Sequence, residues 1–487
     1  MVQYLYAAYS LKTAADVTDP AQKKVLDETS PTSWPQVLLA IAREEMGHLM
    51  TVQNLLLLLR LKPNFEREDF PPPKDLYPFK LHLEPLTRRS LAKYVVAEAA
   101  TDAPGIDDII DLAKESAGAP INRVGVLYGL LGVVFTTAAG IESGATGDIA
   151  WDGIVRGLAA LAHQHQPPPE AWHLHDEDFD PEARSQQADP DDWQVGHLRV
   201  HRVADRAAAI QAIRDIGEQG EGPTTADEAS HFARFFAIFK GGGDVQPFPQ
   251  TEWVPTRDVP TDPKPQDFTH ERTRRWAELA DIRYALLLGY LEHYLLGDAD
   301  ERDLLTGWII SEMRARIGYI ARELTSMPRK PGEAGVAAIP FTLPEVAELH
   351  LPADRNARWE VHRRRTEAAI RKLEEMQADA TDGANAYLAS ILASDRARLD
   401  LLTHPPTGPV RTSFARDILP LFRLWDVKHM AERGLNLQDH DRVSRRAAMI
   451  KMKVSDDDDP MPPAPDAHWT KAQIVLFARW IAEEFPP

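Results

Sequence analysis

Residues 41–60, IAREEMGHLMTVQNLLLLLR, form a long apolar segment that carries Glu44, Glu45 and His48 near its start. The spacing of its Leu, Ile and Met residues predicts a helix. Side chains three positions apart project to neighbouring points on one side of a helix, so Glu45 and His48 share a face. A carboxylate and an imidazole placed in this way can bind one metal ion together. The helix therefore combines an apolar body with a candidate ligand pair.

Length and charge set the broad class of the protein. The chain has 487 residues, which favours two to three domains. It carries 55 Lys and Arg against 74 Asp and Glu, a formal net charge of −19. Such a surface repels phosphate backbones and anionic membranes, so we expect no nucleic-acid partner. The absence of cysteine excludes disulfides, thiolate metal sites, covalent c-type haem and cysteine nucleophiles, and it is compatible with a reducing, cytoplasmic compartment.

Neither a signal peptide nor a membrane span is expected. The start, MVQYLYAAYSLK, has no basic stretch or cleavage site of the secretory type. One uncharged segment, residues 124–141, is just long enough to cross a bilayer. Its glycines, its paired threonines and its isolation favour a buried helix instead.

The pattern along the chain is helical nearly throughout. Helices are expected over residues 1–16, from an N-cap at Ser33 to a point before Pro63, over 86–100 with Glu98, and over 124–141. Residues 163–193 are rich in His, Pro and Asp and are predicted to form an irregular surface insertion. Alternating Val, Ile and Thr residues are scarce, so the fold class is all-α.

The rest of the chain is also expected to be helical, and the chain divides into three regions. Helical segments are expected at 203–222, 228–240, 283–296, 304–327 and 355–380, with a last helical segment from about 411. We expect a metal-binding bundle over residues 1–268, a helical extension over 269–350 and a C-terminal helical region over 351–487.

A second acid–imidazole pair strengthens the metal hypothesis. Glu228 and His231, in the segment EASHF, repeat the spacing of Glu45 and His48 on another apolar segment. Four-helix bundles hold two irons or manganeses with such pairs and with glutamates from other helices. A single pair arises by chance in many proteins, where it is an acid beside a hydrogen-bonded histidine. Two pairs on separate apolar helices favour a metal site.

The segment between these pairs offers two further carboxylates. Glu218 and Glu221 lie in GEQGEG, at the end of a predicted helix with Ile210, Ile213 and Ile216 as its buried stripe. Helical rotation places Glu221 nearer that stripe than Glu218, provided that the helix continues past Gly220.

Several segments together resemble a known family. VQYLYAAYS, EEMGHLMTVQNLL, REDFP, LEPLTRRSLAKYVVAE and EQGEG…SHFARF are similar to the ferritin-like family related to iminophenyl-pyruvate dimer synthases. Those enzymes couple two oxidised aromatic amino acids in the biosynthesis of violacein, rebeccamycin and staurosporine. The similarity extends over residues 1 to about 345 and implies a ferritin-like helical bundle followed by an additional helical C-terminal region.

The resemblance also implies a ligand set. Glu45 and His48 would be the ligands of the second helix, Glu221 or Glu218 the carboxylate of the third, and His231 the imidazole of the fourth, with Glu228 and Glu98 as further family positions. Ferritin-like bundles also place a glutamate on helix one, two turns before the tyrosine that corresponds to Tyr4. That position falls upstream of Met1. Either Met1 is an internal methionine, or the site has lost a ligand and holds one metal or none.

Two other regions carry candidate ligands. His163, His165, His173 and His175 lie in the insertion, although such tracts beside prolines are usually solvated loops. The tail resembles the start and end of a c-type cytochrome domain without its haem-attaching motif. His429 and Met461 could ligate a non-covalent haem, but a degenerate helical module with Trp469, Phe477 and Trp480 as its core is favoured.

The sequence therefore predicts a ferritin-like non-haem enzyme that uses one or two iron ions, or manganese. With dioxygen or peroxide it would catalyse an oxidative step, such as imine or oxidative coupling, on a small aromatic or amino-acid-derived metabolite in natural-product biosynthesis. A homo-oligomer is compatible with this reading. The competing hypothesis is a ferritin-like scaffold that has lost its metals and serves in binding.

Overall fold

The fold is all-α, as the sequence predicts. A computed structural model describes the chain except for residues 68, 71–78, 101–102, 115–123, 144–154, 156–157, 160–168, 194–196, 222–228, 243–244, 250–252, 379–381, 405–409, 457–458 and 464–467. Within the described residues there is no strand, and the only β-type pairings are three isolated bridges.

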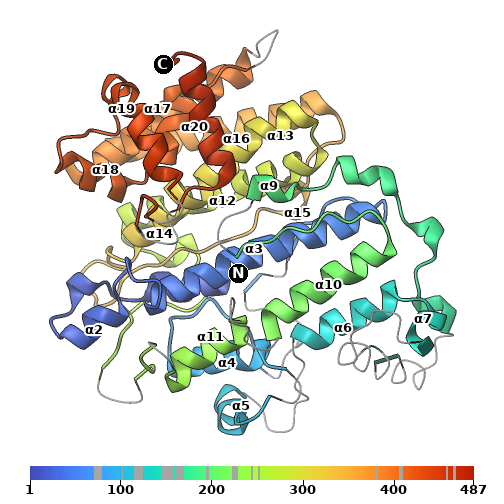
Figure 1. Cartoon of the computed structure of the whole chain (residues 1–487). Coiled ribbons are helices and arrows are strands. Elements are labelled where there is room, and N and C mark those ends of the chain that lie inside the picture. The colour runs from blue at the N-terminus through green and yellow to red at the C-terminus, as the bar shows by residue number, and fades with distance from the viewer. Residues whose placement is uncertain are drawn as a thin grey trace.

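The first half of the chain supplies a long central helix and its neighbours (Figure 1). Helix α3 packs against the N-terminal helix α1 and against α10 and α11. Helix α11 also contacts α4 and α10, so that α3, α4, α10 and α11 surround one interior. Their bounds are α1 Val2–Ser10, α2 Pro20–Val25, α3 Trp34–Leu58, α4 Arg88–Glu98, α5 Asp107–Ala113, α6 Val124–Phe135, α7 Ala138–Ser143, α10 Arg206–Glu221 and α11 His231–Lys240.

Short elements occupy the described part of the expected insertion. It consists of short turns with one short helix: η2 Pro169–Trp172, η3 Asp176–Asp178, η4 Pro181–Ser185 and α9 Pro190–Trp193. His163 and His165 lie outside the described residues.

The second half stacks further helices on the first and ends in a small module (Figure 1). Helices α12 and α16 pack together, and α16 pairs with α17. The bounds are α12 Glu271–Leu296, α13 Ala299–Ser311, the π-helical η6 Glu312–Ile317, α14 Gly318–Leu324, α15 Val346–Leu349, α16 Arg355–Gln377, α17 Asp382–Thr403, the π-helical η7 Phe414–Ile418, α18 Leu424–Ala431, α19 His440–Val454 and α20 Lys471–Ala482.

Local signals explain several helix ends. The Thr87 side chain accepts from the Ser90 amide and begins α4, and Ser230 does the same for the Ala233 amide at α11. Gly241 follows α11 with φ of 85°, a conformation that favours glycine. Polar caps of this kind decide where the apolar segments become helical.

Several predicted helix boundaries were wrong; for example, α12 begins at Glu271 rather than at residue 283. The first helix ends at Ser10 rather than near residue 16, and the apolar helix at 124–141 is interrupted after Phe135. Helix α11 begins at His231, because Ser230 is extended and acts as its N-cap. The helix expected over 228–240 thus begins three residues later than predicted. Glu228 itself lies outside the described residues.

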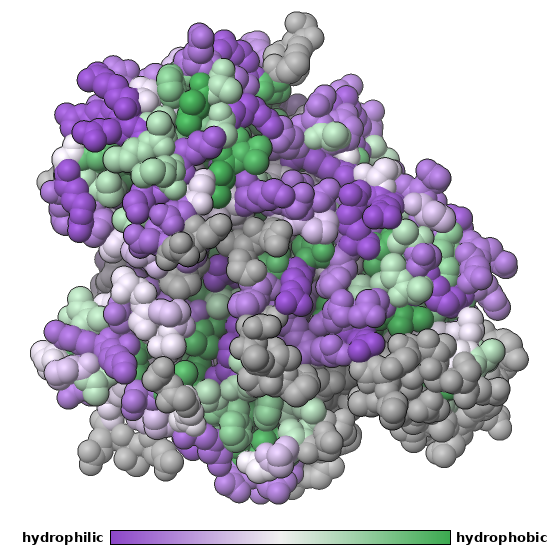
Figure 2. Space-filling model, in the orientation of Figure 1, coloured by the Kyte–Doolittle hydropathy of each residue, from purple (hydrophilic) through white to green (hydrophobic). Residues whose placement is uncertain are grey.

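Apolar side chains pack into several buried clusters. One spans α1, α3, α4 and α11, and a separate one fills the C-terminal module between residues 414 and 485. Trp469, Phe477 and Trp480 belong to the latter, which confirms them as core residues. The face shown in Figure 2 is largely hydrophilic, with apolar side chains gathered over the C-terminal helices. No helix among the described residues has the length and apolar character needed to cross a membrane.

A fully buried pair of histidines joins α12 to α16. His293 Nδ1 and His362 Nε2 are 3.0 Å apart, and the two rings are stacked. Burial, reinforced by the charge of Arg358, lowers the pKa of His293 to about 4, although Glu301 opposes the shift. Burial also holds the pKa of His362 well below 6.5. The folded protein therefore keeps both rings neutral.

This pair should make stability fall in mild acid. Below pH ~6.5 these two histidines become protonated in the unfolded chain but stay neutral in the folded chain. The free energy of unfolding therefore decreases by up to ~1.4 kcal/mol per pH unit for each histidine. The loss begins near the unfolded pKa and continues towards about 4 for His293. Urea unfolding across this range would measure it. His362→Gln should flatten the dependence, whereas His404→Gln, at an exposed site, should not. Equal pH dependence in wild type and His362→Gln would contradict this account.

Candidate metal centre

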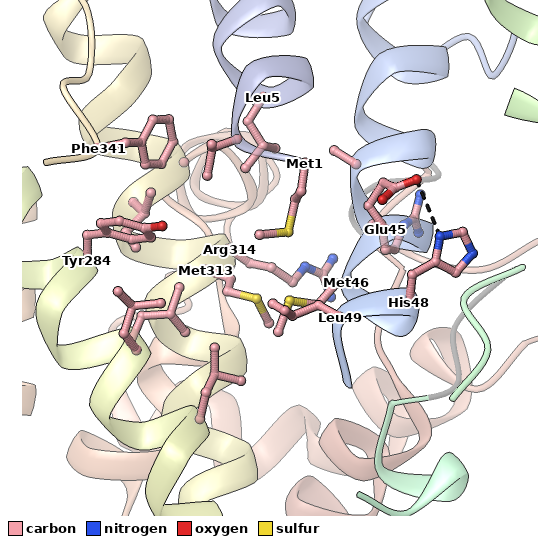
Figure 3. Close-up of a pocket in the computed structure, with 18 of the residues that line it drawn as sticks. Met1, Leu5, Glu45, Met46, His48, Leu49, Tyr284, Met313, Arg314 and Phe341 are labelled. Carbon is pink, nitrogen blue, oxygen red and sulfur yellow. Dashed lines mark ion pairs between the residues drawn. The ribbon is translucent and has the colours of Figure 1, made fainter. Parts of the chain in front are cut away.

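Helix α3 presents Glu45 and His48 towards the interior of the bundle. Glu45 Oε1 lies 3.3 Å from His48 Nδ1, as the i,i+3 spacing requires (Figure 3). Gly47 lies between them, and a Cβ there would come within 2.3 Å of the carbonyl oxygen of Arg199. The glycine thus lets the segment around Arg199 pack directly on this turn of α3.

Helix α11 adds a second imidazole from the opposite side. His231 is the first residue of the helix and is fully buried. Its Nδ1 lies 3.0 Å from Glu45 Oε1, yet this atom has no hydrogen-bond partner of acceptable geometry among the described residues. A buried nitrogen close to a carboxylate, but not hydrogen-bonded to it, is the arrangement of two ligands that share an ion.

The far nitrogen of each imidazole has its own acceptor. His48 Nε2 lies 2.8 Å from Gln219 Oε1 on α10, and His231 Nε2 lies 3.0 Å from Glu44 Oε2 on α3. When the rings are neutral, these bonds assign the proton of each ring to Nε2, so that the two Nδ1 atoms are the ones left to bind an ion. Metal-binding histidines in proteins are commonly fixed in this way by a hydrogen-bonded neighbour.

Glu44 is itself held by Arg234. Arg234 Nη1 donates to Glu44 Oε1 at 3.0 Å, and its Nη2 donates to Oε2. Arg234 follows His231 by one helical turn, so α11 supplies both the imidazole and the guanidinium that clamp one buried carboxylate. This bidentate contact fixes the Glu44 plane and, through it, the His231 ring.

Glu98 completes the polar interior from α4. Its Oε2 lies 3.7 Å from His231 Nδ1, and its Oε1 accepts a hydrogen bond of 2.6 Å from the Tyr4 hydroxyl on α1. A cavity of about 10 Å³ lies between Glu45, His48 and Glu98. This is space for about one water-sized particle.

The charged groups of the cluster strongly change the pKa values of one another. Burial raises the pKa of Glu45, but His48 and His231 outweigh burial and hold it well below 4.5. Burial likewise opposes ionisation of Glu44, whose pKa nevertheless falls to about 2 because His231 and Arg234 stabilise the carboxylate. The metal-free site therefore keeps both carboxylates ionised.

The pKa of His231 is raised, whereas those of the two glutamates are lowered. Burial lowers the pKa of its imidazole, but Glu44, Glu45 and Glu98 together raise it well above 6.5. Without a metal the ring carries a proton, which any ion bound at Nδ1 must displace.

Metal affinity should therefore increase with pH. Because one proton leaves His231 on binding, we expect the apparent affinity to rise by up to about tenfold per pH unit. The rise should extend above pH ~6.5, since the raised pKa moves the competition upward. Equilibrium dialysis with Mn²⁺ at several pH values would measure it. An affinity that stays constant from about pH 7 upward would show that His231 is not a ligand.

The residues present fit a metal ion. Ligand atoms of Glu45, His48 and His231 all lie within 4.8 Å of one another, and Glu98 is adjacent. One carboxylate with two imidazole nitrogens suits iron, manganese or zinc, and thiolate-selective metals are disfavoured. In the part of the chain that the structure describes, this is the one such group.

The other predicted ligands are placed differently. Glu218 is half-exposed and lies on the outer side of α10. Its carboxylate accepts a hydrogen bond of 2.8 Å from Arg214 Nε, so Glu218 is not part of the metal-binding cluster. Glu221 is the last residue of α10, and its side chain is outside the described residues. In the insertion, His173 Nδ1 bonds to the backbone oxygen of Val133 at 2.9 Å.

A large apolar cavity of about 530 Å³ adjoins the cluster. Glu45 and His48 lie on its α3 side, while Met46, Leu49 and Met313 meet near its centre (Figure 3). Its aromatic wall includes Phe65, Phe70, Tyr284 and Phe341. Arg423, His468 and Thr470 of the C-terminal module also line it. Sites of this volume typically hold small organic molecules.

Sequence reasoning missed the residues that orient the ligands. Glu44 was visible beside Glu45, but a helix rotates by about 100° per residue, which gave no reason to place both in one site. Gln219 and Arg234 meet their partners across 171 and 190 residues of sequence. The one available signal was that Arg234 follows His231 by three residues.

Comparison with known proteins agrees with this geometry. The sequence model of the ferritin-like family matches residues 1–240, which hold α1, α3, α4, α10 and α11. The comparison with curated proteins found no match, and the comparison with solved structures found none either. Residues 1–240 are therefore similar in sequence to the ferritin-like family, and their all-helical structure is compatible with that similarity.

Proposed function

We propose that the protein is a metal-dependent oxidoreductase whose Glu45, His48 and His231 hold an iron or manganese ion. The observation that carries the proposal is the convergence of two imidazole Nδ1 atoms and one carboxylate within 4.8 Å in a buried interior. The apolar cavity of about 530 Å³ beside them provides room for a substrate. Glu98 is the neighbouring carboxylate that could complete the ligand set.

When bound, such an ion supplies redox and Lewis-acid chemistry towards dioxygen or peroxide. The chain itself supplies orientation and proton control. Glu44 and Arg234 hold the His231 ring in place, and Gln219 does the same for His48. Burial and the charges of Glu98 and Glu45 raise the pKa of Tyr4 well above 10. Its phenol therefore remains protonated and donates to Glu98, fixing that carboxylate.

The cavity favours a small, largely apolar substrate. Its methionine, leucine and aromatic side chains complement an aromatic ring. The resemblance to iminophenyl-pyruvate dimer synthases supports an aromatic or amino-acid-derived metabolite. The corresponding reaction is an oxidative or imine coupling in natural-product biosynthesis.

Oxygen uptake tests the proposal. Protein loaded anaerobically with ferrous iron should consume dioxygen faster when an aromatic α-keto acid or its imine is present. Glu45→Ala should abolish this stimulated uptake, because it removes a ligand and leaves the cavity. Glu218→Ala is the matched control, since its carboxylate lies outside the cluster and pairs with Arg214, and it should behave as wild type.

Uptake that is identical with and without every candidate substrate, in fully metallated protein, would contradict the enzyme hypothesis. A ferritin-like scaffold that serves in binding would then be the better account.

A further inference from the structure

A second buried polar cluster lies outside the ferritin-like half. It consists of Arg283 on α12, Glu312 and Arg316 in the π-helical η6, and Asp395 and Arg398 on α17. None of these five side chains is more than 2% exposed. Five charged groups thus share one buried interior between three helical elements.

Two carboxylates serve three guanidinium groups in this cluster. Arg283 Nη1 donates to Asp395 Oδ1 at 3.1 Å. Arg398 Nη1 donates to Glu312 Oε1 at 2.7 Å, and Arg316 donates to the same oxygen. Arg316 Nη2 donates to the Ser394 hydroxyl at 2.8 Å and lies 3.3 Å from Asp395 Oδ1.

The cluster carries one positive charge in excess, because its three arginines face two acids. Arginine does not lose its proton in proteins, so titration cannot remove the excess. The neighbouring tyrosines Tyr290 and Tyr387 do not supply a negative charge, since burial raises the pKa of each above 10. Nε atoms of Arg283 and Arg398 and the Glu312 Oε2 have no hydrogen-bond partner among the described residues. An uncompensated charge in such surroundings is strongly unfavourable.

A small cavity adjoins the side of the cluster where Arg316 lies. Its volume is about 30 Å³, and its polar lining includes Arg316, Ser390 and Ser394. A single water requires ~10–15 Å³ on this measure, so the cavity has room for one small ion but not for a phosphate with its ligands. Because the Ser394 oxygen accepts from Arg316, its own proton is available to a further acceptor.

We infer that this cavity binds one small monovalent anion of the size of chloride, held by Arg316 and the hydroxyl of Ser394. The anion balances the excess charge of the cluster. The opposite wall is apolar and belongs to the C-terminal module, through Leu419, Phe422 and Val427. The anion is thus enclosed where this module docks on α17, and it stabilises that docking. The proposal is independent of the metal centre and of the proposed reaction.

Thermal unfolding of the full chain in sodium chloride and in sodium gluconate, at equal ionic strength, tests the inference. Chloride should raise the melting temperature saturably, by on the order of 2–4 °C, because it binds the folded state alone. Arg316→Met, which makes the cluster neutral, should remove the chloride dependence, and Ser394→Ala should weaken it. Arg396→Met, on the exposed side of α17 where Arg396 pairs with Glu374, is the matched control and should retain it.

A bromide soak of wild-type crystals provides a readout that does not depend on the variants folding. The inference predicts an anomalous peak in the cavity, within hydrogen-bonding distance of Arg316 and Ser394. Its absence would overturn the inference and leave ordered water as the occupant. Melting temperatures that are equal in chloride and gluconate would overturn the stabilising role.

Discussion

Replacing His231 with alanine should remove most of the bound iron or manganese while leaving the helix content largely intact. His231 supplies the one ligand that comes from outside α3, and its Nδ1 lies 3.0 Å from Glu45 Oε1. Glu45 and His48 alone offer two ligand atoms from one helix turn. Removing a residue that only hydrogen-bonds to a metal ligand already lowers metal affinity by ~10–100-fold. Removing a ligand itself should therefore lower the affinity by at least this factor. His48→Ala should act in the same direction.

Metal analysis of protein reconstituted under identical conditions provides the measurement, with circular dichroism as the check on folding. His173→Ala, in the histidine-rich insertion, is the control and should keep full metal. If His48→Ala and His231→Ala both retain their metal, the ion lies elsewhere, and the insertion becomes the next candidate.

Replacing Glu44 with alanine should have the largest effect on stability. The carboxylate is buried between the imidazole of His231 and the guanidinium of Arg234. Removing one member of a buried ion pair leaves the other uncompensated and typically costs ~3–5 kcal/mol. The His231 ring also loses the bond that fixes its tautomer, so metal affinity should fall by ~10–100-fold.

Chemical unfolding and metal titration of the same variant separate the two effects. Glu44→Gln keeps an acceptor for His231 Nε2 but loses the charge, so it should cost less metal affinity than Glu44→Ala. Glu218→Ala should change the free energy of unfolding by no more than ~0.5 kcal/mol, as surface substitutions usually do. Wild-type affinity in Glu44→Ala would show that His231 is oriented by other contacts.

Local sequence signals predicted much of the fold. Ser33 and Pro35 marked the start of α3, and the pattern around Glu98 predicted α4. These predictions succeeded because caps and apolar periodicity act within a few residues. The interruption after Phe135 was not predicted, since Thr136 and Thr137 gave only a weak break signal.

The candidate site was predicted only in part. Spacing on one helix was enough to join Glu45 to His48, and the second pair with the same spacing, together with the family resemblance, suggested His231. The contacts of Glu44 with Arg234 and of His48 with Gln219 depend on how α3 packs against α10 and α11. Such long-range packing leaves no periodic signal in the sequence. The role of the tail as one wall of the large cavity was hidden for the same reason.

Anomalous diffraction at the iron or manganese edge, from crystals of reconstituted protein, tests the central claim most directly. The account predicts a peak at ~2.0–2.3 Å from Nδ1 of His231, Nδ1 of His48 and a carboxylate oxygen of Glu45. A second peak towards Glu98 would identify a two-metal site. Fully metallated crystals with no peak among these three residues would contradict the account.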